Sequence, residues 1–282
     1  MADEAGRAHV DWATRGREMI EDAEVTAPMV DQALAWVAAR VPDASDVLDV
    51  GSGPGVAACA LGRLLPGARV RAVDGAPPLL ALAAQRAAAA GLADRFTTAE
   101  IDLPDGLRDL TAADIVWISG VVHHLPDPVA ALRALGDLVR PGGLLAVREG
   151  GLPLRFLPDG VAPGLLSRLE AIGEDRVEHG DHPGGVVAHR GGWPDLMRAA
   201  GLEPAGTRTF LLDLTAPLTP KARRYVRRAL EMRRDFASDQ LGETDRQIAD
   251  RLLDDDHPEG IMRRRDVFLL GASTVHTARA AS

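Results

Sequence analysis

Two acids that flank a glycine-rich turn are the residues with the clearest chemical signature. Residues 47–55 read VLDVGSGPG, so an apolar run containing Asp49 leads directly into a turn with glycine at three alternate positions. Glycine accepts positive φ angles and lets a ligand approach the backbone closely. The second acid, Asp74, ends the next apolar run. One carboxylate can accept hydrogen bonds from both hydroxyls of a ribose, so these features predict a site for a ribose-containing ligand.

The spacing of the glycines separates two kinds of nucleotide ligand. A dinucleotide-binding turn has the pattern G-x-G-x-x-G, whereas Gly51, Gly53 and Gly55 follow G-x-G-x-G, and Val56 stands where the third glycine would be. Pro54 also removes a backbone amide that could bind a pyrophosphate. The pattern argues against a nicotinamide dinucleotide. That ligand and a tight turn without any ligand stay open as alternatives.

Further titratable side chains follow later apolar runs. His123 and His124 come after residues 113–119, and Glu149 ends the run 144–149. Neutral imidazole can accept a proton near neutral pH, so either histidine could be a general base; alternatively, one caps the strand or contacts the ligand. Glu149 could face the reacting group or accept hydrogen bonds from backbone amides. We predict His123, His124 and Glu149 as the catalytic residues.

A parallel sheet must hold these residues together. Between residues 46 and 150, short apolar runs alternate with helical stretches, which predicts a doubly wound α/β sheet. Ligands of such sheets bind at the carboxyl ends of the strands, where the acids and histidines lie. The predicted strands are 46–50, 69–73, 95–101, 113–119, 144–149, 207–214 and 266–274. The expected fold is therefore a Rossmann-like seven-stranded sheet with N-terminal helices and a mostly helical cap insertion.

The remaining segments predict additions to this core. Two amphipathic helices, 10–20 and 26–39, precede the first strand and could fold over the carboxyl edge of the sheet. The predicted division is an N-terminal helical lid at 1–45, the core at 46–150, an insertion at 151–192, completion of the sheet at 193–214 and 263–277, and a helical cap at 215–262. The end of the chain, 278–282, is expected to be disordered.

The insertion and the cap contain charged clusters of less certain meaning. The insertion holds His179, Asp181, His182 and His189. Their chemistry suits a metal, but their spacing is irregular, so we favour a loop that is solvated or lines the substrate, and we predict no metal. Four arginines share one helical face of the cap: Arg223, Arg224, Arg227 and Arg228. They form either a solvated face or a site for an anionic group, with Tyr225 as a pocket wall or core residue.

Residues 46–150 resemble the class I S-adenosylmethionine-dependent methyltransferases, specifically the small-molecule type that includes ubiquinone and menaquinone biosynthesis enzymes. The similar segments are 48–55 (LDVGSGPG), 114–127 (DIVWISGVVHHLPD) and 138–145 (LVRPGGLL). The resemblance implies S-adenosylmethionine as cofactor and S-adenosylhomocysteine as product. It assigns cofactor binding to Asp49, Gly51, Ser52, Gly53, Pro54, Gly55, Asp74, Gly75, Glu100, Ile101, Asp102, Ser119 and Gly120, together with Arg17, which could pair with the methionyl carboxylate.

One segment departs from the family's pattern. The family often has Gly-Asp-Ala after the third strand, where the aspartate meets the adenine amino group. Here residues 99–103 read AEIDL, so either Glu100 or Asp102 could take that role, and Ile101 or Leu103 would pack on the ring. The adenine contact stays ambiguous between the two acids.

The implied activity is in-line transfer of a methyl group to an O, N or C nucleophile of a small organic molecule, in specialised metabolism. Two alternatives stay open: binding of the cofactor without methyl transfer, and a nicotinamide-dependent oxidoreductase. With 32 basic and 41 acidic residues the net charge is -9, which argues against nucleic acid as a partner. A single cysteine, Cys59, excludes an intrachain disulfide. No apolar run could span a bilayer, so we expect a cytoplasmic monomer or homodimer.

Overall fold

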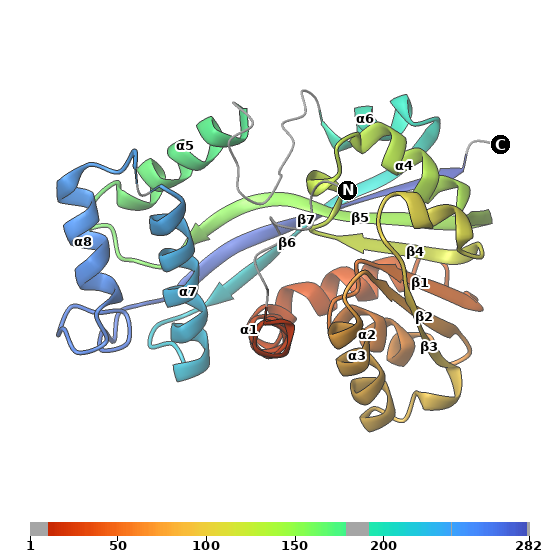
Figure 1. The fold of residues 1–282 in the computed structure, drawn as a ribbon, viewed down its shortest axis with the longest axis horizontal. Helices are drawn as coiled ribbons and strands as arrows, with labels where there is room; N and C mark the ends of the chain where they lie inside the picture. Colours follow the sequence, from red (N-terminus) through yellow and green to blue (C-terminus); the bar gives the residue numbers. More distant parts are fainter. Residues whose placement is uncertain (1–10, 179–191, 238, 281–282) are drawn as a thin grey trace, which may run out of the picture.

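Seven strands form one mixed sheet in the computed structural model, which describes residues 11–178, 192–237 and 239–280. The strand order is β3-β2-β1-β4-β5-β7-β6, with β1 to β5 parallel and β7 antiparallel to both of its neighbours. The strands are β1 (Asp46–Val50), β2 (Arg69–Asp74), β3 (Phe96–Glu100), β4 (Ala113–Ser119), β5 (Val139–Arg155), β6 (Leu202–Leu214) and β7 (Leu269–Ala280). Figure 1 follows this order, and the predicted seven-stranded α/β fold is confirmed.

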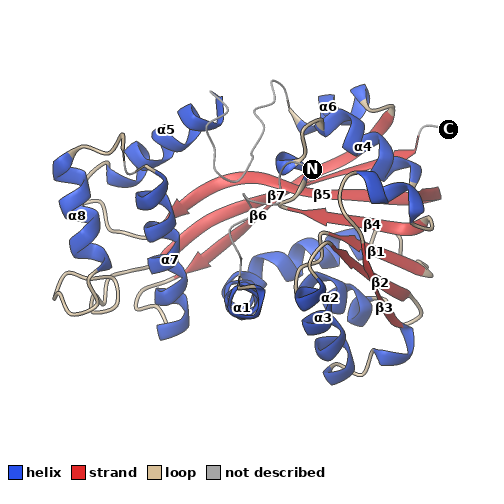
Figure 2. Ribbon diagram, viewed as in Figure 1, coloured by secondary structure: helices blue, strands red, loops and turns tan. Residues whose placement is uncertain are grey.

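Helices cover both faces of the parallel part of the sheet (Figure 2). On one face lie α1 (Trp12–Ala38), α2 (Val56–Leu64) and α3 (Pro77–Ala89); on the other lie α4 (Pro128–Asp137) and α6 (Trp193–Ala199). Because side chains alternate along a strand, Trp117 and Ala146 pack toward the first group, whereas Val116 and Leu145 pack toward the second. The strands are therefore apolar on both faces, as buried parallel strands must be.

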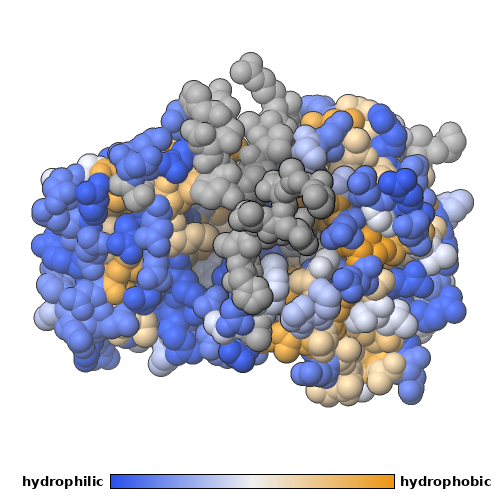
Figure 3. Space-filling model, viewed as in Figure 1, coloured by the Kyte–Doolittle hydropathy of each residue, from blue (hydrophilic) through white to orange (hydrophobic). Residues whose placement is uncertain are grey.

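Three further helices form a cap at one end of the sheet: α5 (Leu165–Glu178), α7 (Pro220–Phe236) and α8 (Glu243–Leu253) (Figure 1). The strand β5 continues to Arg155, well beyond the predicted end at Glu149, and carries the chain toward this cap. Its pairing with β7 shifts register between Arg148 and Gly151, where Gly150 and Gly151 both have positive φ. Such a bulge bends a strand without ending it. The visible surface of the cap is mostly hydrophilic (Figure 3).

The N-terminal region is one continuous helix, α1, so the prediction of two separate helices is wrong. The intervening residues 21–25 read EDAEV and contain no helix breaker. Glu21, Asp22 and Glu24 instead form ion pairs with Arg224, Arg228 and Lys221 of α7. Pro28 lies inside the helix without ending it. The helix α1 thus joins the cap to the core.

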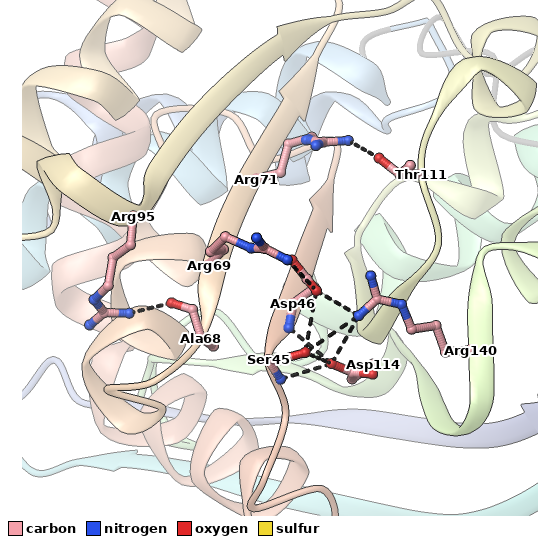
Figure 4. Close-up of polar contacts among 9 residues, drawn as sticks. All are labelled: Ser45, Asp46, Ala68, Arg69, Arg71, Arg95, Thr111, Asp114 and Arg140. Carbon is pink, nitrogen blue, oxygen red and sulfur yellow. Dashed lines mark hydrogen bonds and ion pairs between the residues drawn. The ribbon is translucent and has the colours of Figure 1, made fainter.

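Charged residues gather at the amino ends of the strands (Figure 4). Asp46 accepts hydrogen bonds from Arg69 Nε at 2.9 Å and from Arg140 Nη1 at 2.6 Å. Asp114 accepts from the backbone amide of Ser45 at 2.8 Å and lies 3.3 Å from the same Arg140 nitrogen. The hydrogen bond from Arg69, with a further contribution from Arg140, lowers the pKa of Asp46 to about 2. This network links β1, β2, β4 and β5.

Two expectations from the sequence, the histidine-rich cluster and the lack of a membrane span, can be compared with the structure only within the described residues. His179, Asp181, His182 and His189 lie outside the described residues, so the structure says nothing about them. Among the helices that are described, none is long and apolar enough to cross a lipid bilayer.

Candidate cofactor and active site

A cavity of about 380 Å³ lies at the carboxyl ends of β1, β4 and β5, beneath α1. The glycine turn that follows β1 forms one wall, and α7 of the cap contributes Tyr225. The polar and aromatic side chains that line it include Asp22, Asp49, Ser52, Trp117, Ser119 and Arg148. The cavity has the volume typical of small-molecule sites.

The glycine turn is closely packed against the loop after β4 and against α1. Gly51 has φ 67°, and a Cβ there would lie 2.5 Å from Val121 Cγ2, in the loop after β4. Gly53 has φ 53°, and its Cβ would lie 2.8 Å from Met19 Cε on α1. Any larger residue would therefore be strained and would displace a wall of the cavity. Gly55 differs, because its Cβ would meet Ala83 of α3 at 2.6 Å, which indicates a helix-packing role.

Asp74 sits beside this turn at the end of β2. Its Oδ2 accepts a hydrogen bond from the Gly53 amide at 2.8 Å, and its Oδ1 accepts from the Ala76 amide at 2.9 Å. Each carboxylate oxygen can accept a further hydrogen bond, so the carboxylate is held in place with capacity left for two hydroxyls. A Cβ at Gly75 would lie 3.4 Å from Asp102 Oδ1, and Glu100 is the direct neighbour of Asp74 in the register of β2 and β3. Both acids are exposed, so the choice between them stays open.

Two buried polar groups of the cavity wall have no hydrogen-bond partner among the described residues. They are Oδ2 of Asp49, whose residue is 2% exposed, and the indole Nε1 of the fully buried Trp117. These residues are direct neighbours in the register of β1 and β4. Burial, reinforced by the charge of Asp74, raises the pKa of Asp49 to about 7. Unsatisfied buried polar groups are costly, so both are suited to meet a ligand.

Glu149 and His123 form a hydrogen-bonded pair at the same edge of the sheet. Glu149 is 6% exposed, and its Oε1 accepts hydrogen bonds from the amides of Val121 and Val122, both at 3.0 Å. Its Oε2 lies 2.8 Å from His123 Nδ1. If Nδ1 carries the proton, Nε2 is free to accept one. The ring of the exposed His124 stands 4.0 Å from that of His123.

The structure brings together only part of the predicted site. The cavity wall includes six predicted residues: Asp49, Gly51, Ser52, Gly53, Pro54 and Ser119. Gly120 follows β4, and its amide bonds the Arg148 carbonyl at 3.1 Å. Arg17 lies on the exposed side of α1 with Nη2 bonded to Thr14 Oγ1 at 3.1 Å, away from the cavity wall. Ile101 packs against Gly106. The roles of these residues stay predictions.

The residues of the cavity wall that sequence reasoning missed include Asp22, Trp117 and Arg148. Arg148 and Glu149 are the two charged residues of the segment LLAVREGG at 144–151, and of the two only Glu149 was predicted as a site residue. Trp117 could not be told from a core residue by its position in a buried strand. Within the described ranges, no three His, Cys, Asp or Glu side chains gather as a metal site would require.

Known proteins resemble this chain over the segment that builds the site. A family model described as a methyltransferase domain matches residues 48–145. The ubiquinone biosynthesis O-methyltransferase of Xanthomonas axonopodis pv. citri is 35% identical over 177 residues, which are 60% of this chain and 68% of that protein. The chain belongs to the class I S-adenosylmethionine-dependent methyltransferases. It spans less than half the length of several other curated relatives that it matches.

Solved structures share the methyltransferase fold. A Bacillus halodurans protein, provisionally described as a methyltransferase, has a TM-score of 0.54 with 18% identity and covers 89% of this chain and 99% of its own. The [4+2]-cyclase SpnF has a TM-score of 0.51 with 19% identity, covering 89% of this chain and 82% of its own. At these identities the likeness shows the fold alone. Membership of the methyltransferase family decides against the nicotinamide alternative.

The described residues fit the cofactor of this methyltransferase family. S-adenosylmethionine carries a ribose, a sulfonium, and an ammonium and a carboxylate bonded to the same carbon. Asp74 has the free acceptor capacity that the ribose hydroxyls need, and Asp49 offers an unpartnered buried carboxylate oxygen to a cation. The turn between Gly51 and Gly53 lines the cavity together with Asp49, and Asp74 accepts a hydrogen bond from the Gly53 amide.

Proposed function

We propose that this methyltransferase transfers a methyl group from S-adenosylmethionine to an O, N or C nucleophile of a small organic molecule, in specialised metabolism. The observation that carries the proposal is the cavity beneath α1, which has the glycine turn on one wall and Tyr225 of the cap on another. The volume of about 380 Å³ is that of a small-molecule site. The net charge of -9 agrees with this choice.

The family likeness supports the acceptor class. A relative that is 35% identical is named for ubiquinone biosynthesis, and its acceptor is a small organic molecule by that name. Helix α7 of the cap contributes Tyr225 to the cavity wall, which supports an acceptor pocket formed in part by the cap. We therefore assign the chain to specialised metabolism.

The chemistry divides between cofactor and protein. When bound, S-adenosylmethionine supplies an electrophilic methyl group whose carbon–sulfur bond breaks as the acceptor's lone pair forms the new bond. The protein binds and aligns the reactants and keeps water out, which is where most of its contribution lies. Asp74 binds the ribose, Asp102 lies on the adenine side, and Asp49 holds the ammonium. His123 accepts the proton that an O or N acceptor loses, and Glu149 is a positioning residue for His123.

The test combines binding and turnover. Calorimetry with S-adenosylhomocysteine measures whether the cofactor site exists, and transfer of labelled methyl from S-adenosylmethionine to a small-molecule cell extract measures the reaction. We expect binding together with a labelled product below the size of a peptide. Binding without label in any fraction would favour a protein that uses the cofactor without methyl transfer. Absence of binding would exclude both functions.

A further inference from the structure

Arg148, at the end of the parallel part of β5, is the most unusual charged group of the cavity wall. The residue is part-buried, and desolvation lowers the pKa of Arg148. Its Nε donates to Ser273 Oγ at 2.8 Å, and its Nη1 donates to Ser119 Oγ at 2.8 Å. A guanidinium has five N–H donors, so these two neutral hydroxyls fix its plane and leave three donors.

No carboxylate of the described residues forms an ion pair with Arg148, although the charge of the nearby Glu149 partly opposes the effect of burial on its pKa. Glu149 follows Arg148 directly, yet its two oxygens accept from Val121, Val122 and His123 on the other side of the strand. Asp22, which also lines the cavity, forms an ion pair with Arg228 of α7. Tyr225 faces the same space, and burial raises the pKa of its phenol, so it stays neutral. A buried cation that lacks a counter-charge is costly, which indicates that an anionic ligand completes the site.

The order of the strands places this ligand apart from the cofactor's ribose. Along the carboxyl edge, Asp74 ends β2, the glycine turn follows β1, Ser119 ends β4 and Arg148 lies on β5. The register pairs Ser119 with Arg148. Arg148 on β5 is therefore separated by β1 and β4 from Asp74 on β2, the residue that fits the cofactor's ribose, and it lines the same cavity as Tyr225 of the cap.

Building on the proposed function, we infer that the methyl acceptor carries a carboxylate group, and that Arg148, oriented by Ser119 and Ser273, binds it. Three free N–H donors of one planar guanidinium allow a two-bonded fork to a carboxylate. The neutral serines orient the guanidinium without competing for its charge. Arg148 is thus a specificity-determining residue that selects acids over neutral acceptors and fixes the end of the acceptor that points away from the methyl group.

The first test needs no turnover and uses formate as the smallest carboxylate. With the protein saturated with S-adenosylhomocysteine, formate should raise the Tm by about 2–4 °C relative to chloride at equal ionic strength. Arg148→Met should lose this response, and Arg148→Lys should keep part of it. The matched control is Arg71→Met, because Arg71 also has a hydroxyl partner, Thr111 at 2.6 Å, but lies at the opposite edge of the sheet (Figure 4). That variant should respond as the wild type does.

Three results of the formate test would overturn the inference. One is an equal formate response in wild type and Arg148→Met. Another is loss of the response in Arg71→Met as well, which would indicate non-specific anion binding. The third is a formate response in the free protein that saturating S-adenosylhomocysteine abolishes, because Arg148 would then bind the methionyl carboxylate of the cofactor.

The second test asks which extract fraction contains the acceptor. The extract is separated on an anion exchanger before the labelled-methyl assay, and a second portion is treated with carbodiimide and methylamine to convert carboxylates to amides. Acceptor activity should stay in the retained fraction and disappear after amidation. Arg148→Gln should raise the acceptor KM roughly 10- to 100-fold and leave the KM for S-adenosylmethionine within about twofold, because only the acceptor loses a charged hydrogen bond. Label in the neutral fraction would refute the carboxylate, whereas no label anywhere would refute the proposed function instead.

Discussion

Aspartate and arginine side chains lie at both the amino and the carboxyl edge of the sheet, but their partners differ between the two edges. On β1, Asp46 stands at the amino edge and Asp49 near the carboxyl edge; the pKa of Asp46 is lowered to about 2 and that of Asp49 is raised to about 7. On β5, Arg140 contacts two carboxylates, whereas Arg148 contacts two serines. Each edge has a cavity, of about 370 and 380 Å³.

The difference lies in where the counter-charge comes from. At the amino edge, Asp46 and Asp114 are paired with arginines of the same network, which is open to solvent, so the charges link the strands (Figure 4). At the carboxyl edge, Asp49 is buried and Arg148 is part-buried, and neither forms an ion pair with an opposite charge among the described residues. Paired charges indicate structure, and unpaired buried charges indicate a ligand. Cavity volume alone does not distinguish the two edges.

The largest expected effect is at Asp74. Replacing it with alanine removes two acceptors for the ribose and leaves the amides of Gly53 and Ala76 without their partner. Each hydrogen bond to a charged group contributes about 1.5–3 kcal/mol, so the Kd for S-adenosylhomocysteine should rise roughly 100- to 1,000-fold. Calorimetry measures it. The control is Asp94→Ala, an exposed acid in the wall of the amino-edge cavity, which should bind normally. Equal weakening in both variants would contradict the assignment of the carboxyl edge.

A smaller effect is expected at His123. If its imidazole accepts the acceptor's proton, His123→Gln should lower kcat about 100-fold and leave the Kd for S-adenosylhomocysteine unchanged, measured by labelled-methyl transfer and calorimetry. Glu149→Gln should lower kcat less, because the amide can still hold the loop through Val121 and Val122. His257→Gln, a change in the loop after α8, is the control. Full kcat in His123→Gln would exclude proton transfer by this residue.

The sheet could be predicted because its signals are local. Apolar runs separated by helices and glycine turns determine a parallel sheet, and all seven predicted strands exist. The ends of the strands were harder to predict. The strand β5 was predicted to end at Glu149, but it runs to Arg155 because the bulge at Gly150 and Gly151 bends the strand without ending it. The helix α1 continues through residues 21–25 because their acids pair with α7, about 200 positions away.

Site residues that belong to a sequence motif could be predicted, whereas residues whose role depends on their burial and their neighbours could not. The glycine turn and Asp74 carry their own signature, and they lie together in the structure. Arg148 became informative only once its surroundings were known, because in the structure it donates hydrogen bonds to two serines and forms no ion pair with the adjacent Glu149. Glu149 and His123 were both predicted, but their pairing at 2.8 Å depends on adjacent strands and could not be derived from sequence spacing.

The pH dependence of cofactor binding sharpens the comparison at Asp49. A cationic ammonium binds the ionised carboxylate, so wild type, with the pKa of Asp49 near 7, must release a proton to bind below that pH. Affinity for S-adenosylhomocysteine should rise about tenfold between roughly pH 6 and pH 8. Asp49→Asn should bind more weakly and show no such slope in calorimetry. The same slope in both proteins would mean that Asp49 does not meet the cation.

The raised pKa of Asp49 also predicts how the stability of the ligand-free protein depends on pH. Because the pKa of Asp49 is raised above its ordinary value of 3.8, the folded state binds the proton more tightly than the unfolded state. The free energy of unfolding should therefore fall as pH rises from about 4 to about 7, and Asp49→Asn should remove this decline. Urea unfolding of both proteins over this range measures it.

At Asp46 the free energy of unfolding should change with pH in the opposite direction, and this is the smallest of the expected effects. Its pKa is lowered from 3.8 to about 2, so its ion pairs stabilise the fold above about pH 4 and lose this contribution as pH falls toward 2. Water screens the pair because the Arg69 side chain is 74% exposed, so Asp46→Asn should cost only about 1 kcal/mol at neutral pH, a Tm decrease of about 2–4 °C. The deficit should vanish near pH 2, and the Kd for S-adenosylhomocysteine should not change. A weakened Kd in Asp46→Asn would show that the two edges are coupled, and the division between a structural edge and a ligand edge would fail.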